Sequence, residues 1–315
     1  MGGYNLFRGE HASYNPILMN QILKEEWQWD GVVISDWGAV HDTHTAIIGG
    51  LDMEFGSWTD GLTEGTSNAY DNYWLANPYL KGIKEGIYTD KELNEKVRRV
   101  LRLTFRTAMN NDRPWGSMVS DAHKTACRKI GEEGIVLLQN NANLLPINLS
   151  KVKRIAVIGE NAIKMMTVGG GSSSLKVKYE VTPLEGLKKR IGKQAEIIYA
   201  RGYVGDPTGE YNGVKTGQNL KDDRSPKELR TEALQVASNA DIVLFIGGLN
   251  KSEYQDCEGT DRKTMDLPYN QNELIMDLLQ VNKKLVVINI SGTGVAMPWK
   301  NHCLLYTSDA ADDMQ

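Results

Sequence analysis

The chain has 315 residues, of which 41% are hydrophobic and 24% are charged, a composition typical of folded globular proteins and not of disordered ones. Its formal net charge of −4 excludes the broad positive field of a nucleic-acid-binding protein. The sequence contains no run of about eighteen apolar residues and therefore predicts no membrane span.

A helix followed directly by a buried strand is predicted near the start of the chain. Asn15 and Pro16 form an N-cap with proline at the first helical position, and the apolar residues that follow repeat at helical spacing. The run Val32–Ile34 then predicts a fully buried strand of a parallel sheet. Asp36 follows this strand, and a carboxylate there is costly to desolvate unless it is paired or used. An aspartate that only caps the next loop explains the position equally well.

A second strand is predicted over 51–55, and a long loop over 57–80. Thr89 and Glu92 then form a capping box that opens a strong helix. The buried face of this helix is predicted to consist of its apolar residues at helical spacing, Leu93, Val97, Val100, Leu101, Phe105 and Ala108. The pattern breaks at Asn110–Pro114. We therefore expect one domain over residues 1–110 and a linker over 111–120.

A second domain, in which strands and helices alternate, is predicted over residues 121–302. The expected elements are a helix over 120–139, strand 154–159, helix 183–191, strand 196–200, helix 227–238, strand 241–247, helix 270–281 and strand 285–291. This alternation predicts an α/β fold with a mostly parallel sheet. Residues 303–315 continue no helical or strand period, so we expect them to be a non-native tail outside the fold.

Two further segments are candidates for chemistry. The four acids Glu253, Asp256, Glu258 and Asp261 lie within one predicted loop, and crowding of carboxylates raises their pKa, which suits a general acid. A solvated acidic loop explains the same composition. The segment 169–174, Gly-Gly-Gly-Ser-Ser-Ser, suits hydrogen bonding to a polyol or a plain turn, and it lacks the lysine of a phosphate loop. Three cysteines and five histidines match no metal or disulfide pattern, so no metal and no cofactor is expected.

Several of these motifs resemble glycoside hydrolase family 3, whose members are mostly β-glucosidases. Residues 1–43, with Ser-Asp-Trp at 35–37, resemble the last third of that family's catalytic barrel, and Glu-Gly-Thr-Asp-Arg at 258–262 resembles part of its second domain. The resemblance extends to about His302. It implies the C-terminal part of a (β/α)8 barrel followed by an α/β sandwich domain. It also implies that the N-terminal barrel strands of the same protein are missing, which would leave this fragment inactive.

The resemblance also assigns roles to particular residues. It implies that Asp36 is the nucleophile and Glu258 the general acid/base of a retaining glycosidase. It further implies that Tyr4 lies beside the nucleophile, that Trp37 shapes the sugar subsite and that Ser172 reaches the substrate. The implied substrate is an oligosaccharide or an aryl or alkyl β-glycoside, chiefly a β-glucoside, with β-xylosides as an alternative. A non-catalytic carbohydrate-binding or interaction module that keeps the same motifs is the second interpretation.

Two local expectations follow from this comparison. Gln28 stands where the family has glycine, and because glycine suits a left-handed C-cap, Gln28 should cost up to about 1 kcal/mol. Arg262 is expected to pair with Asp261 and so leave Glu258 as the proton donor. The resemblance allows a periplasmic or secreted location, which the sequence does not decide.

Overall fold

The computed structural model describes residues 1–56, 73–141, 143–167, 169, 175, 177–205, 210–211, 214–215, 218–301 and 305–309. The chain divides into two compact units, Met1–Gly116 and Ser117–Gln315, and the boundary falls within residues 111–120. Each unit is described by itself. Within the described ranges, no helix is long and apolar enough to cross a membrane.

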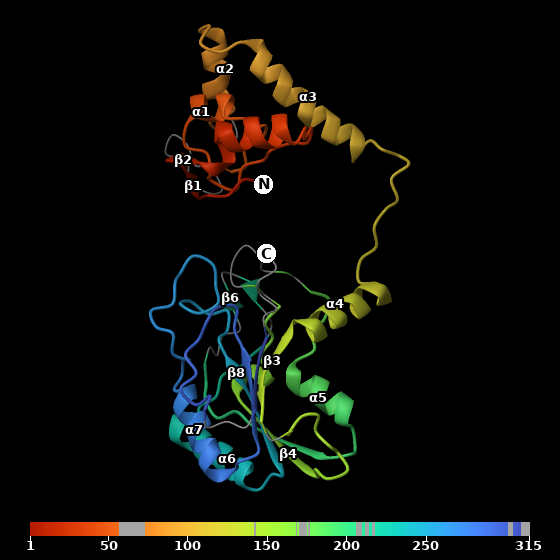
Figure 1. Ribbon diagram of the computed structural model, residues 1–315, viewed down its shortest axis with the longest axis vertical. Coiled ribbons are helices and arrows are strands. Elements are labelled where there is room, and N and C mark those ends of the chain that lie inside the picture. The colour runs from red at the N-terminus through yellow and green to blue at the C-terminus, as the bar shows by residue number, and fades with distance from the viewer. Residues whose placement is uncertain are drawn as a thin grey trace. The chain divides into compact units, whose positions relative to one another are not determined.

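The first unit consists of short elements around a small apolar core (Figure 1). In chain order they are the antiparallel strands β1 (Leu6–Phe7) and β2 (Glu10–His11), the 3-10 helix η1 (Ala12–Tyr14), the π-helix η2 (Ile17–Glu26), and the α-helices α1 (Thr43–Ile48), α2 (Asn77–Lys84) and α3 (Asp90–Arg106). Asn15 begins η2 as predicted, because its Oδ1 accepts hydrogen bonds from the backbone N–H of Ile17 at 3.0 Å and of Leu18 at 3.2 Å. Gln28, just after η2, has a φ of +53°, so the expected left-handed position is present.

The predicted strand at Val32–Ile34 is wrong in its extent. Ile34 forms a single parallel bridge with Met53, and Val33 is buried whereas Val32 and Ile34 are only half-buried. On its other edge Ile34 accepts one hydrogen bond, from the backbone N–H of Gly2 at 2.8 Å. A central strand needs a continuous ladder on both edges, and the described residues supply only these isolated bonds. The strand predicted over 51–55 is likewise reduced to Met53, and α2 occupies part of the predicted loop over 57–80.

Helix α3 begins at its predicted N-cap, but it buries a different face from the predicted one. Thr89 Oγ1 accepts a hydrogen bond from the backbone N–H of Lys91 at 3.3 Å. The buried residues of α3 are Lys96 and Arg99. The side chain of Lys96 donates to the carbonyls of Ile47 and Leu51, and that of Arg99 to the carbonyls of Trp29 and Gly31. The reason is that loop carbonyls need donors, which leucine and valine cannot supply.

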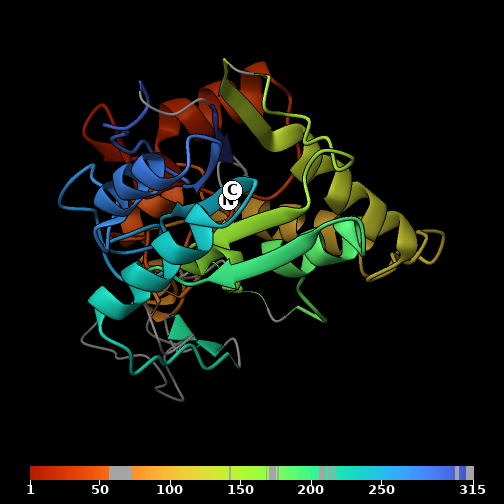
Figure 2. The ribbon, with the colours of Figure 1, turned by 90° about the horizontal axis from the view of Figure 1, so that it is seen from below.

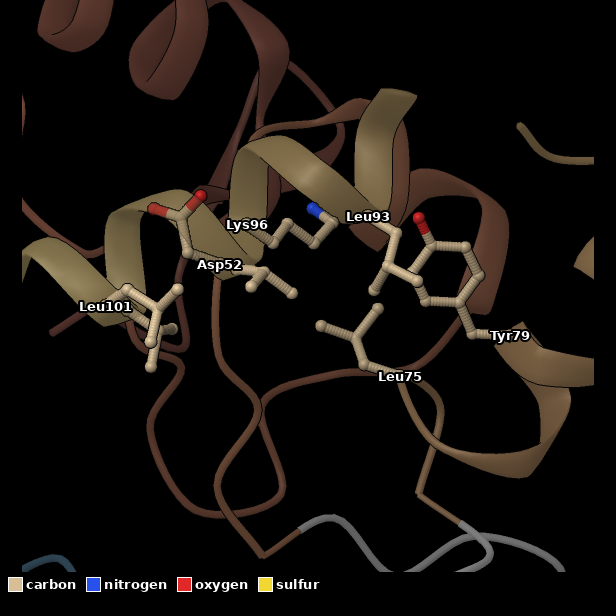
Figure 3. A pocket seen from close by; sticks show the side chains of 8 residues that line it. Asp52, Leu75, Tyr79, Leu93, Lys96 and Leu101 are labelled. Carbon is tan, nitrogen blue, oxygen red and sulfur yellow. The ribbon is translucent and has the colours of Figure 1, made fainter. Parts of the chain in front are cut away.

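The apolar residues of α3 instead line an open pocket. Val97 is 44% exposed and Leu101 is 49% exposed. The pocket wall is completed by Leu75 and by Tyr79 of α2, which point toward Leu93 (Figure 3). Helix α3 therefore has an apolar stripe as predicted, but the described part of the unit does not bury it.

A six-stranded sheet forms the second unit, which confirms the predicted α/β fold. Its order is β3-β10-β9-β8-β4-β5, with β3 antiparallel to β10 and every other neighbouring pair parallel. The strands are β3 (Ile135–Asn140), β4 (Arg154–Ile158), β5 (Glu196–Ala200), β8 (Ile242–Gly248), β9 (Leu285–Ile290) and β10 (Leu305–Asp309). A separate two-stranded sheet pairs β6 (Glu210–Tyr211) with β7 (Val214–Lys215).

Helices cover both faces of this sheet. They are α4 (Asp121–Gly134), the 3-10 helix η4 (Glu160–Ala162), α5 (Pro183–Ile191), α6 (Pro226–Ser238) and α7 (Gln271–Val281). Leu184 of α5 packs on one face with Val157, whereas α6 and α7 pack on the other face around Phe245. The last two helices lie side by side in both views (Figure 1 and Figure 2). Capping boxes at Thr182 and Ser225 start α5 and α6.

Helix α4 is shorter than predicted. It ends at Gly134, and Ile135–Asn140 continues as β3, so the helix predicted over 120–139 is wrong beyond residue 134. Gly131 and Gly134 weaken the last helical turn, and the β-branched and apolar run that follows favours an extended backbone.

The expectation that residues 303–315 lie outside the fold is wrong for Leu305–Asp309. These residues form β10, which pairs parallel with β9 and antiparallel with β3. Leucine, tyrosine and threonine favour extended backbone, and a place between two strands satisfies backbone donors and acceptors on both edges. The absence of a recognisable period in a five-residue strand explains why the pattern gave no signal.

Candidate active site

Asp36 lies in the first unit, directly after the parallel Ile34–Met53 bridge. This is the carboxyl end of the paired segment, where functional groups of parallel α/β folds gather. Asp36 is half-buried, and its Oδ1 accepts a hydrogen bond from the backbone N–H of Trp37 at 2.8 Å. Within the described part of the chain, this is the one hydrogen bond that the carboxylate makes.

Tyr4 and Trp37 lie together next to Asp36. Tyr4 Oη donates a hydrogen bond to the carbonyl oxygen of Trp37 at 2.7 Å. The indole of Trp37 is 57% exposed, yet its ring centroid lies 5.3 Å from that of Phe55. Gly56, at φ +54°, leaves room for this ring, because a Cβ there would lie 2.1 Å from it. The result is a supported flat apolar surface facing solvent, which suits stacking on a sugar face.

The loop that carries Asp36 is fastened to the segment around Met53. The backbone N–H of Ser35 donates to the carbonyl of Met53 at 3.0 Å, and Ser35 Oγ accepts from the backbone N–H of Phe55 at 2.8 Å. The backbone N–H of Gly38 donates to the carbonyl of Phe55 at 3.2 Å. Ser35 is fully buried, so its hydroxyl serves the loop and does not face a ligand.

Asp52 is the buried acid of the first unit, and sequence reasoning missed it. It is 6% exposed, it accepts a hydrogen bond from the backbone N–H of Val33 at 2.7 Å, and Lys24 Nζ lies 2.9 Å from its Oδ1. Arg99 Nε lies 4.0 Å away. Burial is also the main cause that lowers the pKa of Lys24. With its oxygens satisfied by the fold, Asp52 has a structural role; the signal that could have found it is an acid inside an apolar run.

The second candidate acid, Glu258, lies in the second unit in the loop after β8. Its side chain is exposed. Gly259 has a φ of +87°, which confirms the predicted sharp turn next to Glu258. Thr260 closes the loop, because its Oγ1 accepts a hydrogen bond from the backbone N–H of Tyr254 at 2.9 Å and lies 3.1 Å from Cys257 Sγ.

The neighbouring acids have different surroundings. Asp256 is half-buried, with both carboxylate oxygens engaged by Gly292 N–H at 2.6 Å and Thr293 Oγ1 at 3.2 Å. Glu253 and Asp261 are exposed. The expected pairing of Arg262 with Asp261 is wrong. The guanidinium of Arg262 instead donates a hydrogen bond to the backbone carbonyl of Gly294. Sequence reasoning missed this use of Asp256, because Gly292 is thirty-six residues away.

A fully buried ionic cluster lies where β4 ends. Glu160 is 0% exposed, and Arg201 Nη2 lies 2.7 Å from its Oε2, while Lys164 Nζ lies 3.5 Å from its Oε1. The backbone N–H of Gly205 also donates to Oε2 at 2.6 Å. A buried carboxylate satisfied by two cations and an amide holds neighbouring loops together.

Ser172 lies outside the described residues. Across the described ranges, no group of three or more His, Cys, Asp or Glu side chains is arranged to hold a metal ion.

The sheet topology of the second unit defines an α/β domain with a mostly parallel sheet. Residues 135–307 match the Glycosyl hydrolase family 3 C-terminal domain, and the chain therefore belongs to glycoside hydrolase family 3. It is 47% identical over 305 residues to Beta-glucosidase BoGH3A of Bacteroides ovatus, covering 95% of this chain and 40% of that protein. It is 33% identical to Thermostable beta-glucosidase B of Acetivibrio thermocellus, covering 95% of this chain and 35% of the relative.

A solved structure gives the same relationship. The GH3 β-glucosidase of Bifidobacterium adolescentis superposes with a TM-score of 0.74 at 27% identity, covering 98% of this chain and 41% of that one. The chain thus spans about 40% of the length of the proteins it matches. This share agrees with the predicted fragment of a longer family 3 protein.

Proposed function

We propose that this chain is part of a retaining glycoside hydrolase that acts on β-glucosides. The similar proteins named as β-glucosidases support this substrate class. On the same grounds we propose that residues 1–110 are the C-terminal part of a (β/α)8 barrel and that residues 121–302 are an α/β sandwich domain. The parallel Ile34–Met53 bridge and the helices on both faces of the second sheet support that assignment.

The proposed mechanism uses two carboxyl groups in two steps. In the first step, Asp36 attacks the anomeric carbon and forms a glycosyl ester while Glu258 gives its proton to the departing glycosidic oxygen. In the second step, Glu258 takes a proton from water, and the water oxygen replaces Asp36 at the anomeric carbon. Retention requires the two carboxyls to lie about 5–5.5 Å apart across the substrate.

One observation carries the assignment of Asp36. Its carboxylate is half-buried and bonded to Trp37 N–H, beside an exposed indole that is held in place by Phe55 and Gly56. In this proposal Trp37 shapes the sugar subsite and Tyr4 orders the loop next to the nucleophile through the Trp37 carbonyl. Ser172 contacts the substrate.

We also propose that the 315-residue chain alone does not hydrolyse glycosides. It spans 40% of the Bacteroides ovatus β-glucosidase, and in this proposal the remaining strands of the (β/α)8 barrel correspond to the part of that protein that the chain does not match. A barrel without its remaining strands exposes sheet edges and half of its core.

The test uses a chimera in which these residues replace the matching 40% of the Bacteroides ovatus β-glucosidase. We expect Glu258→Ala to slow alkyl glucosides by about 100-fold or more, and aryl glucosides with good leaving groups much less, because good leaving groups need little protonation. Added azide should partly restore turnover by replacing the water that Glu258 activates. Asp36→Ala should lose hydrolysis of both substrates without azide rescue, since it removes the covalent step.

The exposed loop acid Glu253 gives the matched control. Glu253→Ala should keep the activity of the unmodified chimera on both substrates. If Glu253→Ala loses activity with azide rescue while Glu258→Ala keeps it, the acid/base assignment is wrong. If the chimera binds glucosides but Asp36→Ala and Glu258→Ala leave a residual turnover unchanged, the non-catalytic carbohydrate-binding interpretation replaces the enzyme.

A further inference from the structure

We propose that Asp256 and Arg262 are positioning residues that fix the loop carrying Glu258 in place. The inference rests on the proposed function in one respect only, the role of Glu258 as acid/base. Asp256 precedes Glu258 by two residues and Arg262 follows it by four. Both side chains bond to the same short turn after β9, residues 291–294.

The two attachments lie on either side of Glu258. On the N-terminal side, the carboxylate of Asp256 accepts from Gly292 N–H at 2.6 Å and from Thr293 Oγ1 at 3.2 Å. On the C-terminal side, Arg262 Nη2 donates to the carbonyl of Gly294. Bonds from a charged group to backbone are roughly twice as strong as neutral ones. The five-residue span between Asp256 and Arg262 is thus held at both ends.

Two backbone hydrogen bonds act at the outer parts of this loop. The N–H of Asp256 donates to the carbonyl of Asn250 at 3.0 Å, next to the end of β8, and the N–H of Ala296 donates to the carbonyl of Met265 at 2.7 Å. These bonds act at the outer parts of the loop, and the bond from Tyr254 N–H to Thr260 Oγ1 closes the turn around Glu258. A Cβ added at Gly259 would meet no atom within 4 Å, so the turn itself has little packing to hold it.

The consequence for catalysis follows from geometry. A general acid must reach the glycosidic oxygen within hydrogen-bonding distance, and a displacement of about 1 Å can cost on the order of 100-fold in rate. Glu258 is exposed and directly precedes the turn at Gly259, so apolar packing does not set its position. The attachment of Asp256 and Arg262 to the turn after β9 supplies that restraint.

The first experiment uses the 315-residue chain itself. Asp256→Ala should increase hydrogen exchange over residues 254–262 and speed alkylation of Cys257, read by peptide mass spectrometry, by about fivefold or more, because the opening free energy falls by about one hydrogen bond to a charged group. Asp256→Asn, which keeps one acceptor oxygen, should give a smaller increase. The control Glu253→Ala removes the same charge from the same loop at an exposed side chain. Equal exchange and alkylation in Asp256→Ala and Glu253→Ala would overturn the proposal.

The second experiment uses the chimera and separates positioning from loss of fold. Asp256→Ala and Arg262→Gln should lower kcat/KM for alkyl glucosides by about 10- to 100-fold while aryl glucosides with good leaving groups change by less than about threefold. A purely structural defect would lower both substrates equally, which contradicts positioning. If the activity of Glu258→Ala does not depend on the leaving group, the proposed acid/base role of Glu258 is wrong. If it does depend on the leaving group but Asp256→Ala has the same activity as Glu253→Ala, only the positioning proposal is wrong.

Discussion

The stability of the first unit should rise with pH between about 7.5 and 9.5, because of one buried lysine. Lys96 is 7% exposed and donates to the carbonyls of Ile47 and Leu51, at the end of α1 and just beyond it. Burial is the main cause that lowers its pKa from the ordinary 10.5 to about 8. The carboxylates of Asp52 and Glu92 act to raise this pKa, but burial outweighs them, and apolar side chains such as Leu93 and Tyr79 line the pocket beside Lys96 (Figure 3).

The sign and the size of the effect follow from linkage. Between pH 8 and 10.5 the unfolded chain holds a proton at Lys96 that the folded unit has lost, so the free energy of unfolding rises with pH in this window. Over the accessible part, about pH 7.5 to 9.5, the gain is roughly 2 kcal/mol. Lys24, whose pKa burial also lowers, acts in the same direction, so the contribution of Lys96 must be taken as a difference between variants.

The variant Lys96→Met isolates the contribution of Lys96 to the pH dependence of the unfolding free energy. At pH 7 it removes a burial cost of about 3 kcal/mol but leaves two carbonyls unpaired at about 1–3 kcal/mol each, so its net effect should be small. The pH slope should instead flatten by about 2 kcal/mol. Urea unfolding followed by tryptophan fluorescence reports mainly on this unit, because six of the seven tryptophans precede residue 117. Equal slopes in the two proteins would show that Lys96 is charged in the folded unit at pH 9.5 and refute the reasoning.

Three further outcomes are expected. Gln28→Gly should stabilise the first unit by up to about 1 kcal/mol and Gln28→Ala should not, because only glycine relieves the φ of +53°; urea unfolding compares them. Glu160→Gln should destabilise the second unit by about 3–5 kcal/mol, whereas the exposed control Glu196→Gln should cost less than about 1 kcal/mol. Calorimetry measures both losses, and a larger loss for Glu196→Gln than for Glu160→Gln would contradict the prediction. Deleting residues 303–315 should lower the melting temperature of the second unit by more than about 4 °C if β10 holds β3 to the sheet, and a loss under 2 °C would argue against that pairing.

The sequence predicted elements well where local signals agreed with each other. Helix α5 has its predicted bounds, Pro183–Ile191, because the Thr182–Glu185 capping box, the proline and the apolar spacing all favour one start. Strand β5 has its predicted bounds for a similar reason, an isolated β-prone run after a helix stop. The end of α4 was missed because glycines such as Gly131 and Gly134 weaken a helix without always ending it, and helical and strand patterns overlap in the run of four apolar residues that follows.

Contacts between distant residues were beyond the reach of such patterns. The apolar spacing of α3 correctly indicated an amphipathic helix, but it could not show that Lys96 and Arg99 would be the buried residues. Their carbonyl partners lie in α1 and in loops forty-five to seventy positions away. The same holds for Asp256, whose partner Gly292 carries no side-chain signal. The spacing of apolar residues shows that a helix has an apolar face, but the tertiary fold determines which residues pack against that face.

Asp36 and Asp52, the two acids near the parallel Ile34–Met53 bridge, differ in burial and in hydrogen bonding. The premise that an acid after an apolar run must be compensated holds for Asp52, whose carboxylate meets Lys24 and the N–H of Val33 inside the unit. It does not hold for Asp36, which is only half-buried and keeps one hydrogen bond, from its own neighbour Trp37. A compensated carboxylate cannot also attack a substrate without giving up the bonds that hold the fold. This contrast supports the proposal that Asp36 is the nucleophile, whereas Asp52 holds the backbone at Val33 and the ammonium group of Lys24.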